Sequence, residues 1–169
     1  MSNPQLFETL RTGAIAGAFG GLAEIAWVTL YGGITGVDPA VLARGVTTAA
    51  GVTALLPDSP VTIGIGVHMM LAVALGMVLA LAWRALGAAR PGLINPYPFM
   101  LTAFAGIWAI NFFVVLPVVS PQFVHMVPYA VSLASKLLFG ATAAEVVRDQ
   151  ASLATRQPAL ARPKALSRR

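Results

Sequence analysis

Six polar residues interrupt the apolar segments of this chain, and their side chains are of types that can bind ligands or exchange protons. They are Glu24, His68, Asn111, His125, Tyr129 and Lys136. Carboxylates and imidazoles can bind protons or metal ions, an amine can hold an anion, and an amide or phenol can form hydrogen bonds. An ionisable group in apolar surroundings is costly, so each of these residues needs either a partner or a function.

Each ionisable side chain has a structural and a functional interpretation. Glu24 is either a protonated or hydrogen-bonded carboxyl that ties its helix to its neighbours, or a proton or cation acceptor. His68 and His125 are either hydrogen-bonded histidines of a helix bundle or ligands of a metal or haem. For Lys136 the alternatives are snorkelling, a pair with Glu24 if its stem extends outward, a carbonyl, Ser132, a bound anion, or a neutral amine.

The histidines raise the question of a metal or haem. Imidazole and thioether ligands suit copper(I), and methionines stand near both histidines, at positions Met69, Met70, Met77 and Met126. Adjacent helix residues point about 100° apart, so these side chains cannot all share one face. A haem needs two ligands at similar depth, whereas these histidines differ by roughly 7 Å. We therefore expect no cofactor, and keep haem or copper on His68 and His125 as the alternative.

Composition places these residues in a membrane. Of the 169 residues 57% are hydrophobic and 10% charged, and the mean hydropathy is +0.79, whereas a soluble domain carries about 25% charged residues. The lack of cysteine excludes disulfides and thiolate chemistry. No hydrolase triad, phosphate loop, nucleotide fingerprint or carboxylate dyad occurs, so we expect no enzyme.

Hydropathy predicts an all-α integral membrane protein, a bundle of four transmembrane helices. A bilayer core of about 30 Å needs about 20 apolar residues, and the predicted spans are 13–31, 61–83, 98–119 and 123–147. These make residues 1–148 a single membrane domain. Asp38 and Pro39 are typical of a helix start, so residues 39–56 are predicted to form a short helix that lies on the outer surface or re-enters the membrane.

The distribution of basic residues predicts the orientation. Arg11, Arg84, Arg90 and Arg148 flank one side of the predicted spans, and only Arg44 lies on the other. The positive-inside rule then places both termini in the cytoplasm of a multi-pass inner-membrane protein.

The C-terminal residues 149–169 are predicted to be a basic, poorly ordered cytoplasmic tail. Five of the eleven basic residues lie in the last fourteen positions, at Arg156, Arg162, Lys164, Arg168 and Arg169. The net charge of +5 therefore belongs largely to the tail, and we expect no nucleic-acid partner.

Small residues predict the faces by which the helices pack. They recur at helical spacing at Gly13, Gly17, Gly21, Gly64 and Gly76, and close backbone approach at such residues drives helix association in lipid. A polar stripe in the last span contains His125, Tyr129, Ser132, Lys136 and Gly140.

Depth predicts where the polar residues meet. At about 1.5 Å per residue, Glu24, His68 and Asn111 lie roughly 10 to 12 Å below the outer end, His125 about 5 Å, and Lys136 near or past the middle. We expect Glu24, His68, Asn111 and His125 to converge around one cavity in the outer half, with His68 next to Glu24 or Asn111.

Several segments resemble a known family. They are Gly13-Ala14-Ile15-Ala16-Gly17, His68 with the later Leu75-Gly76, the stretch from Ala103 to Asn111, and Ala144-Glu145-Val146-Val147-Arg148 with Asp149. Together they resemble the family of small bacterial inner-membrane proteins typified by YagU, which is linked to acid resistance. The resemblance implies a four-helix inner-membrane protein without enzyme activity, and it supplies no site residues.

The favoured function is therefore a non-enzymatic small inner-membrane protein, either an accessory or interaction subunit of a larger membrane assembly or a stress-related protein. Its expected partners are the lipid bilayer and other membrane subunits or itself. The alternative is a redox or transport component that holds a metal, haem or proton at an outer-half site built on His68 and His125.

Overall fold

Four long helices dominate the computed structural model, which describes residues 4–55, 57–89 and 95–160. Within these residues the chain forms helices and connections only. The segments able to cross a membrane are α1 (Pro4–Thr35), α3 (Pro60–Ala89), α4 (Pro96–Ile110) with its continuation to Val119, and α7 (Tyr129–Leu160). The predicted all-α four-helix bundle is confirmed, and the chain is a multi-pass membrane protein.

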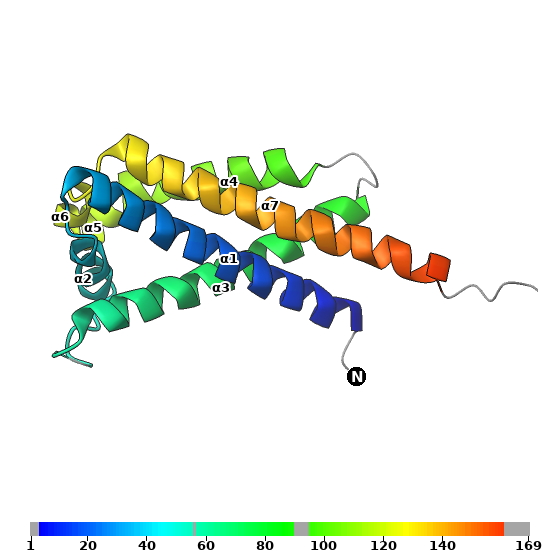
Figure 1. Ribbon diagram of the computed structural model, residues 1–169, viewed down its shortest axis with the longest axis horizontal. Coiled ribbons are helices and arrows are strands. Elements are labelled where there is room, and N and C mark those ends of the chain that lie inside the picture. The colour runs from blue at the N-terminus through cyan, green and yellow to red at the C-terminus, as the bar shows by residue number, and fades with distance from the viewer. Residues whose placement is uncertain (1–3, 56, 90–94, 161–169) are drawn as a thin grey trace, which may run out of the picture.

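Shorter helices lie at one end of the bundle. They are α2 (Ala40–Ala49), the π-helical turn η1 (Asn111–Val115), α5 (Leu116–Val119) and α6 (Pro121–Val124). The long helices lie side by side in the order α4, α7, α1, α3, and α2 crosses one end of this row (Figure 1). We call this the α2 end. The opposite end holds the start of α1 and the end of α7, and we call it the terminal end.

The core fills the half of the bundle nearer the terminal end. Phe104 of α4 and Phe139 of α7 are fully buried there, with ring centroids 4.2 Å apart. Residues of all four long helices join them, namely Ala16, Ala72, Leu79, Met100, Ala143, Ala144 and Val147. Trp83 packs against Phe99 at 5.6 Å between centroids, so α3 also reaches α4 here. This half is therefore closed by apolar side chains.

Glycines bring α1 and α3 into backbone contact. A Cβ atom on Gly17 would lie 2.3 Å from the carbonyl oxygen of Ala72, and one on Gly76 would lie 2.3 Å from that of Gly13. Gly21 also faces Ala72, whose Cβ atom would lie 2.8 Å from a Cβ atom on this glycine. Real Cβ atoms do not approach other atoms this closely, so only glycine allows this crossing.

Gly64 belongs to a different interface from the one its spacing suggested. A Cβ atom there would lie 1.9 Å from the carbonyl oxygen of Ala43, which belongs to α2. Gly64 therefore seats α2 against the start of α3, whereas Gly13, Gly17 and Gly76 join α1 to α3.

The helix boundaries differ from the predicted ones where polar residues support a helix beyond the apolar run. Helix α1 begins at Pro4 because its polar first turns are held at the terminal end. There Arg84 donates hydrogen bonds to Gln5 and Thr9, at 2.9 and 3.1 Å. Helix α7 continues to Leu160, beyond the predicted end of the last span at 147. The poor order of the tail stays a prediction. Arg90, Arg162, Lys164, Arg168 and Arg169 lie outside the described residues.

Prolines account for the irregular end of α4 and the late start of α7. Pro117 has no amide hydrogen to bond to the residue four positions earlier, and the preceding turn is π-helical, with the Leu116 amide bonded to the Asn111 carbonyl. Pro128 disfavours helical geometry at Val127, so α7 begins at Tyr129 instead of position 123.

Helix α2 spans Ala40–Ala49, which is shorter than the predicted 39–56. Asp38 caps it, since its Oδ1 accepts the Ala40 amide at 2.9 Å and its Oδ2 accepts Arg44 Nη2 at 2.9 Å. The Ala40 amide first, and then the Arg44 guanidinium, hold the pKa of the Asp38 carboxyl below its ordinary value. The cap is thus an ionised carboxylate at neutral pH.

Candidate functional site

Three helices bring ionisable side chains together inside the membrane-spanning part. Lys136 Nζ of α7 lies 2.8 Å from both carboxylate oxygens of Glu24 of α1. Ser135 Oγ lies 3.2 Å from Glu24 Oε1, and His68 Nε2 of α3 lies 3.8 Å from Glu24 Oε2. We call Glu24, His68, Ser135 and Lys136 the intramembrane cluster.

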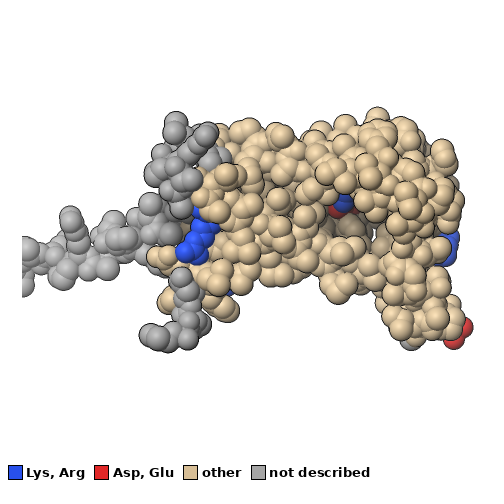
Figure 2. All heavy atoms as spheres, turned by 180° about the vertical axis from the view of Figure 1, so that it is seen from behind, with Lys and Arg blue, Asp and Glu red and all other residues tan. Residues whose placement is uncertain are grey.

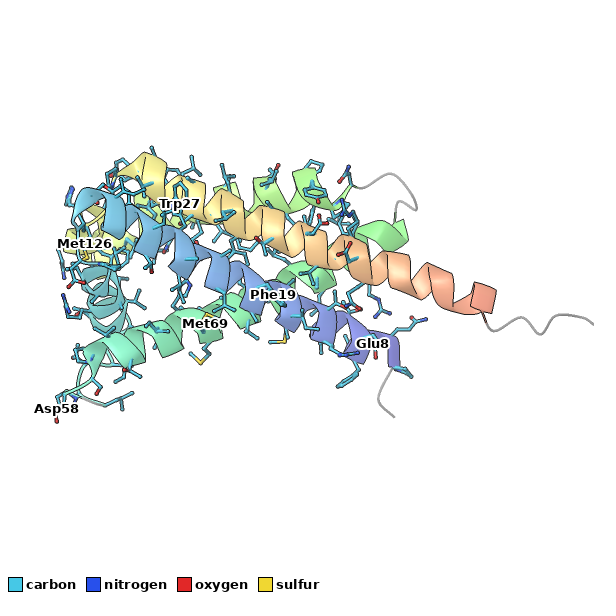
Figure 3. The ribbon with its side chains drawn as sticks, in the orientation of Figure 1. Glu8, Phe19, Trp27, Asp58, Met69 and Met126 are labelled. Atoms are coloured by element: carbon cyan, nitrogen blue, oxygen red, sulfur yellow. The ribbon has the colours of Figure 1, made fainter. Side chains whose placement is uncertain are left out.

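Neighbouring contacts hold the intramembrane cluster in place. Gly20, one helical turn before Glu24, lets the Phe139 ring come so close that a Cβ atom would lie 2.4 Å from it. One turn beyond Glu24, Trp27 Nε1 donates a hydrogen bond to the Val131 carbonyl at 3.1 Å (Figure 3). The two contacts fix the spacing of α1 and α7 on both sides of the Glu24–Lys136 pair.

The cluster is only partly shielded. The side chain of Glu24 is 5% exposed, whereas those of Lys136 and His68 are 22% and 25% exposed. Figure 2 shows a hollow in one face of the bundle with a basic and an acidic side chain inside it, in agreement with these exposures. The carboxylate is therefore buried behind its two basic neighbours.

The charges of the cluster determine what it can do chemically. Glu24 and Lys136 form a neutral ion pair, and His68 Nε2 lies 3.3 Å from the Gly21 carbonyl oxygen. An imidazole that bonds a carbonyl through one nitrogen keeps the other for a proton. The cluster is thus neutral with a neutral His68 and carries one positive charge with a protonated His68.

Asn111, His125 and Tyr129 do not join the cluster, which corrects the expected convergence around one cavity. Within the described residues, none of the three forms a hydrogen bond or ion pair with Glu24, His68 or Lys136. Asn111 lies at the junction of α4 with η1 and is half-buried. Because α7 begins only after Pro128, His125 lies in the turn before it and is exposed.

His125 and Tyr129 instead line a shallow pocket at the α2 end. Its other walls are Phe112, Phe113, Pro117, Pro121 and Val124. The Tyr129 ring meets the Phe112 ring edge-on, with the centroids 5.9 Å apart. It is tilted against the Phe113 ring, with the centroids 5.7 Å apart. Trp108, held by a hydrogen bond to Ser132 Oγ at 3.0 Å, completes this aromatic group.

Sequence reasoning did not assign a role to Ser135. It lies next to Lys136 but off the polar stripe, and its place beside Glu24 arises from the crossing of α1 and α7. A second group, at the terminal end, was missed as well. There Tyr97 donates to Glu145, and Arg148 bonds both of them, which joins the start of α4 to α7.

The two histidines have different neighbours, so the structure does not assemble the proposed pair of ligands. Across residues 4–55, 57–89 and 95–160, no three His, Cys, Asp or Glu side chains are grouped as a metal site. Comparison of the chain with protein-family models, curated proteins and solved structures finds no match. Kinship with the YagU-like family stays a prediction.

Proposed function

We propose that the chain is a small non-enzymatic protein of the bacterial inner membrane, an accessory or interaction subunit of a larger membrane assembly or a stress-related membrane protein. The observation that carries the proposal is the pairing of Glu24. Both oxygens lie 2.8 Å from Lys136 Nζ, and Ser135 contacts one of them. A carboxylate bonded in this way joins α1 to α7 and has little capacity left for acid–base chemistry on a substrate.

The proposal includes an orientation with both termini in the cytoplasm. Arg11, Arg84 and Arg148 lie toward the terminal end, and Arg44 lies on α2. A surplus of basic residues on one side of the spans supports that side as the cytoplasmic one.

The role as a subunit predicts a stable assembly. The chain, extracted from its own membranes in a mild detergent, is expected to migrate as a complex of fixed composition with other membrane proteins or with itself. Gly106 lies on the outward side of α4, where a Cβ atom would have no neighbouring atom within 4 Å. The variant Gly106→Leu is expected to keep the fold but to weaken a complex that uses this side. A protein that stays monomeric under every mild extraction would contradict the proposal.

His68 favours a second candidate function, a transport component that binds a proton. Its Nε2 lies 3.8 Å from Glu24 Oε2, and its side chain is one quarter exposed, at 25%. Imidazole is the side chain that ordinarily titrates between about pH 5 and 8, and can therefore gain and lose a proton near neutral pH. Since His125 lies elsewhere, this candidate rests on Glu24, His68 and Lys136.

The titration of His68 tests the second candidate. The chain has two histidines, so the variant His125→Gln leaves His68 as the single imidazole. Its ring nitrogens, labelled with 15N, are expected to report one protonation step between about pH 5 and 8 in lipid nanodiscs. This protonation step should be absent from the double variant that carries both His125→Gln and His68→Gln. A His68 that keeps one charge state over this range would exclude proton binding there.

A further inference from the structure

We propose that the opening framed by α1, α2 and α3 is filled with water and connects the intramembrane cluster to the α2 end of the bundle but not to the terminal end. The inference rests on the proposed proton binding, because it names the side from which His68 would receive its proton.

The opening results from the way α1 and α3 cross. The helices touch at Gly13, Gly17 and Gly21 and then diverge toward the α2 end, where α2 bridges them (Figure 1). Beyond the crossing, Gly64 holds α3 against α2 and no longer against α1. The hollow of Figure 2 lies in this part of the bundle.

Charge determines what fills the opening. His68 and Lys136 are 25% and 22% exposed, although they lie inside the membrane-spanning helices. Figure 2 shows a basic and an acidic side chain within the hollow. His68 follows Pro60 by eight residues, so it lies roughly 12 Å from the start of α3. Ionisable side chains at such depth face the bundle interior or a water-filled cavity, because hydrocarbon cannot solvate them. Water is therefore the occupant that these side chains require.

Tight packing closes the path from the intramembrane cluster to the terminal end. Between the cluster and the terminal end, Ala72 and Ala80 of α3 are 4% and 3% exposed, and Ala16 of α1 is 1% exposed. A Cβ atom on Gly13 would already lie 2.6 Å from the Cα atom of Met77. The apolar core lies behind this contact, so close-packed side chains of the described residues separate the cluster from the terminal end.

Cysteine accessibility tests the inference, because the chain contains no native cysteine. His68→Cys and Lys136→Cys are made as two separate variants, and a membrane-impermeant, positively charged methanethiosulfonate reagent is added to one side of sealed vesicles. Both thiols are expected to react about tenfold faster from the α2 side than from the terminal side, since a thiol reacts rapidly only where it meets water.

Three control positions calibrate the labelling. Thr48→Cys, exposed on α2, should react from the α2 side alone and so reports the orientation. Ala80→Cys is buried in the helix crossing and should not react. Met70→Cys is placed where the native side chain is 64% exposed but lies on the opposite side of α3 from His68, toward lipid, and should also stay unlabelled.

Two outcomes would overturn the inference. One is reaction of His68→Cys and Lys136→Cys from the terminal side, and the other is no reaction of either thiol from the α2 side while Thr48→Cys reacts. If the thiols are labelled from the α2 side but the 15N spectra of His68 show no protonation step, the water-filled opening is retained and the proposed proton binding is rejected. The two proposals therefore fail separately.

Discussion

Replacing Gly17 with leucine is expected to destabilise the bundle more than any truncation of an apolar core side chain. The first added carbon alone would lie 2.3 Å from the Ala72 carbonyl oxygen, and backbone atoms cannot rotate away as a side chain can. The helices must therefore separate, and the close contact that holds them is lost. Gly76→Leu should act in the same way, because its Cβ would meet the Gly13 carbonyl oxygen at 2.3 Å.

Thermal unfolding in detergent measures this effect against matched variants. Leu79→Ala removes a core side chain that is 8% exposed and should cost about 2 to 5 kcal/mol. Gly66→Leu adds the same side chain to the same helix as Gly76→Leu, at a position with no atom within 4 Å, and should change stability by less than about 0.5 kcal/mol. If Gly17→Leu and Gly76→Leu melt like the unaltered protein, the α1–α3 crossing described above is wrong.

The second large effect is expected from removing one partner of the Glu24–Lys136 pair. Glu24→Leu leaves the Lys136 ammonium 22% exposed and without its counter-ion, and Lys136→Met leaves a carboxylate that is 5% exposed. Breaking a buried pair in this way typically costs about 3 to 5 kcal/mol. The doubly substituted protein should be more stable than either single variant, because an apolar pair of similar volume carries no unpaired charge.

A double-mutant cycle separates pairing from other effects of the substitutions. Glu8→Gln serves as the control, since Glu8 pairs with Arg11 at 3.7 Å and both side chains are 63% exposed. That surface pair should contribute less than about 1 kcal/mol. Equal losses for Glu24→Leu and Glu8→Gln, or strict additivity of the Glu24 and Lys136 substitutions, would show that the ion pair does not hold α1 to α7.

The apolar spans and the glycine contacts could be predicted from the sequence because both depend on local properties. The hydropathy of about 20 residues decides whether a helix can cross the bilayer. Spacing on a helix decides which small residues share a face, so Gly13, Gly17 and Gly76 could be assigned to packing faces from the sequence alone. Their partner helix is a tertiary property, and so Gly64 could be grouped with them although it contacts α2.

The depth of a residue depends on where its helix begins, which hydropathy locates poorly. A span starting at position 123 would place Lys136 thirteen residues into the helix, roughly 20 Å deep, whereas the start at Tyr129 makes this seven residues and roughly 10 Å. Pro128 therefore places Lys136 nearer to the α2 end than the predicted span did. The same shift leaves His125 in a turn, away from His68.

By itself, the sequence of this protein determined a four-helix membrane bundle with ionisable groups inside it, because hydropathy and helical periodicity are properties of short segments. Only the tertiary structure decided which of these groups meet. Helix crossing and helix ends set the distances between side chains on α1, α3 and α7, and a difference of one helical turn, about 5.4 Å, separates an ion pair from two unpaired charges. For that reason Glu24, His68 and Lys136 form one cluster, while Asn111 and His125 lie outside it.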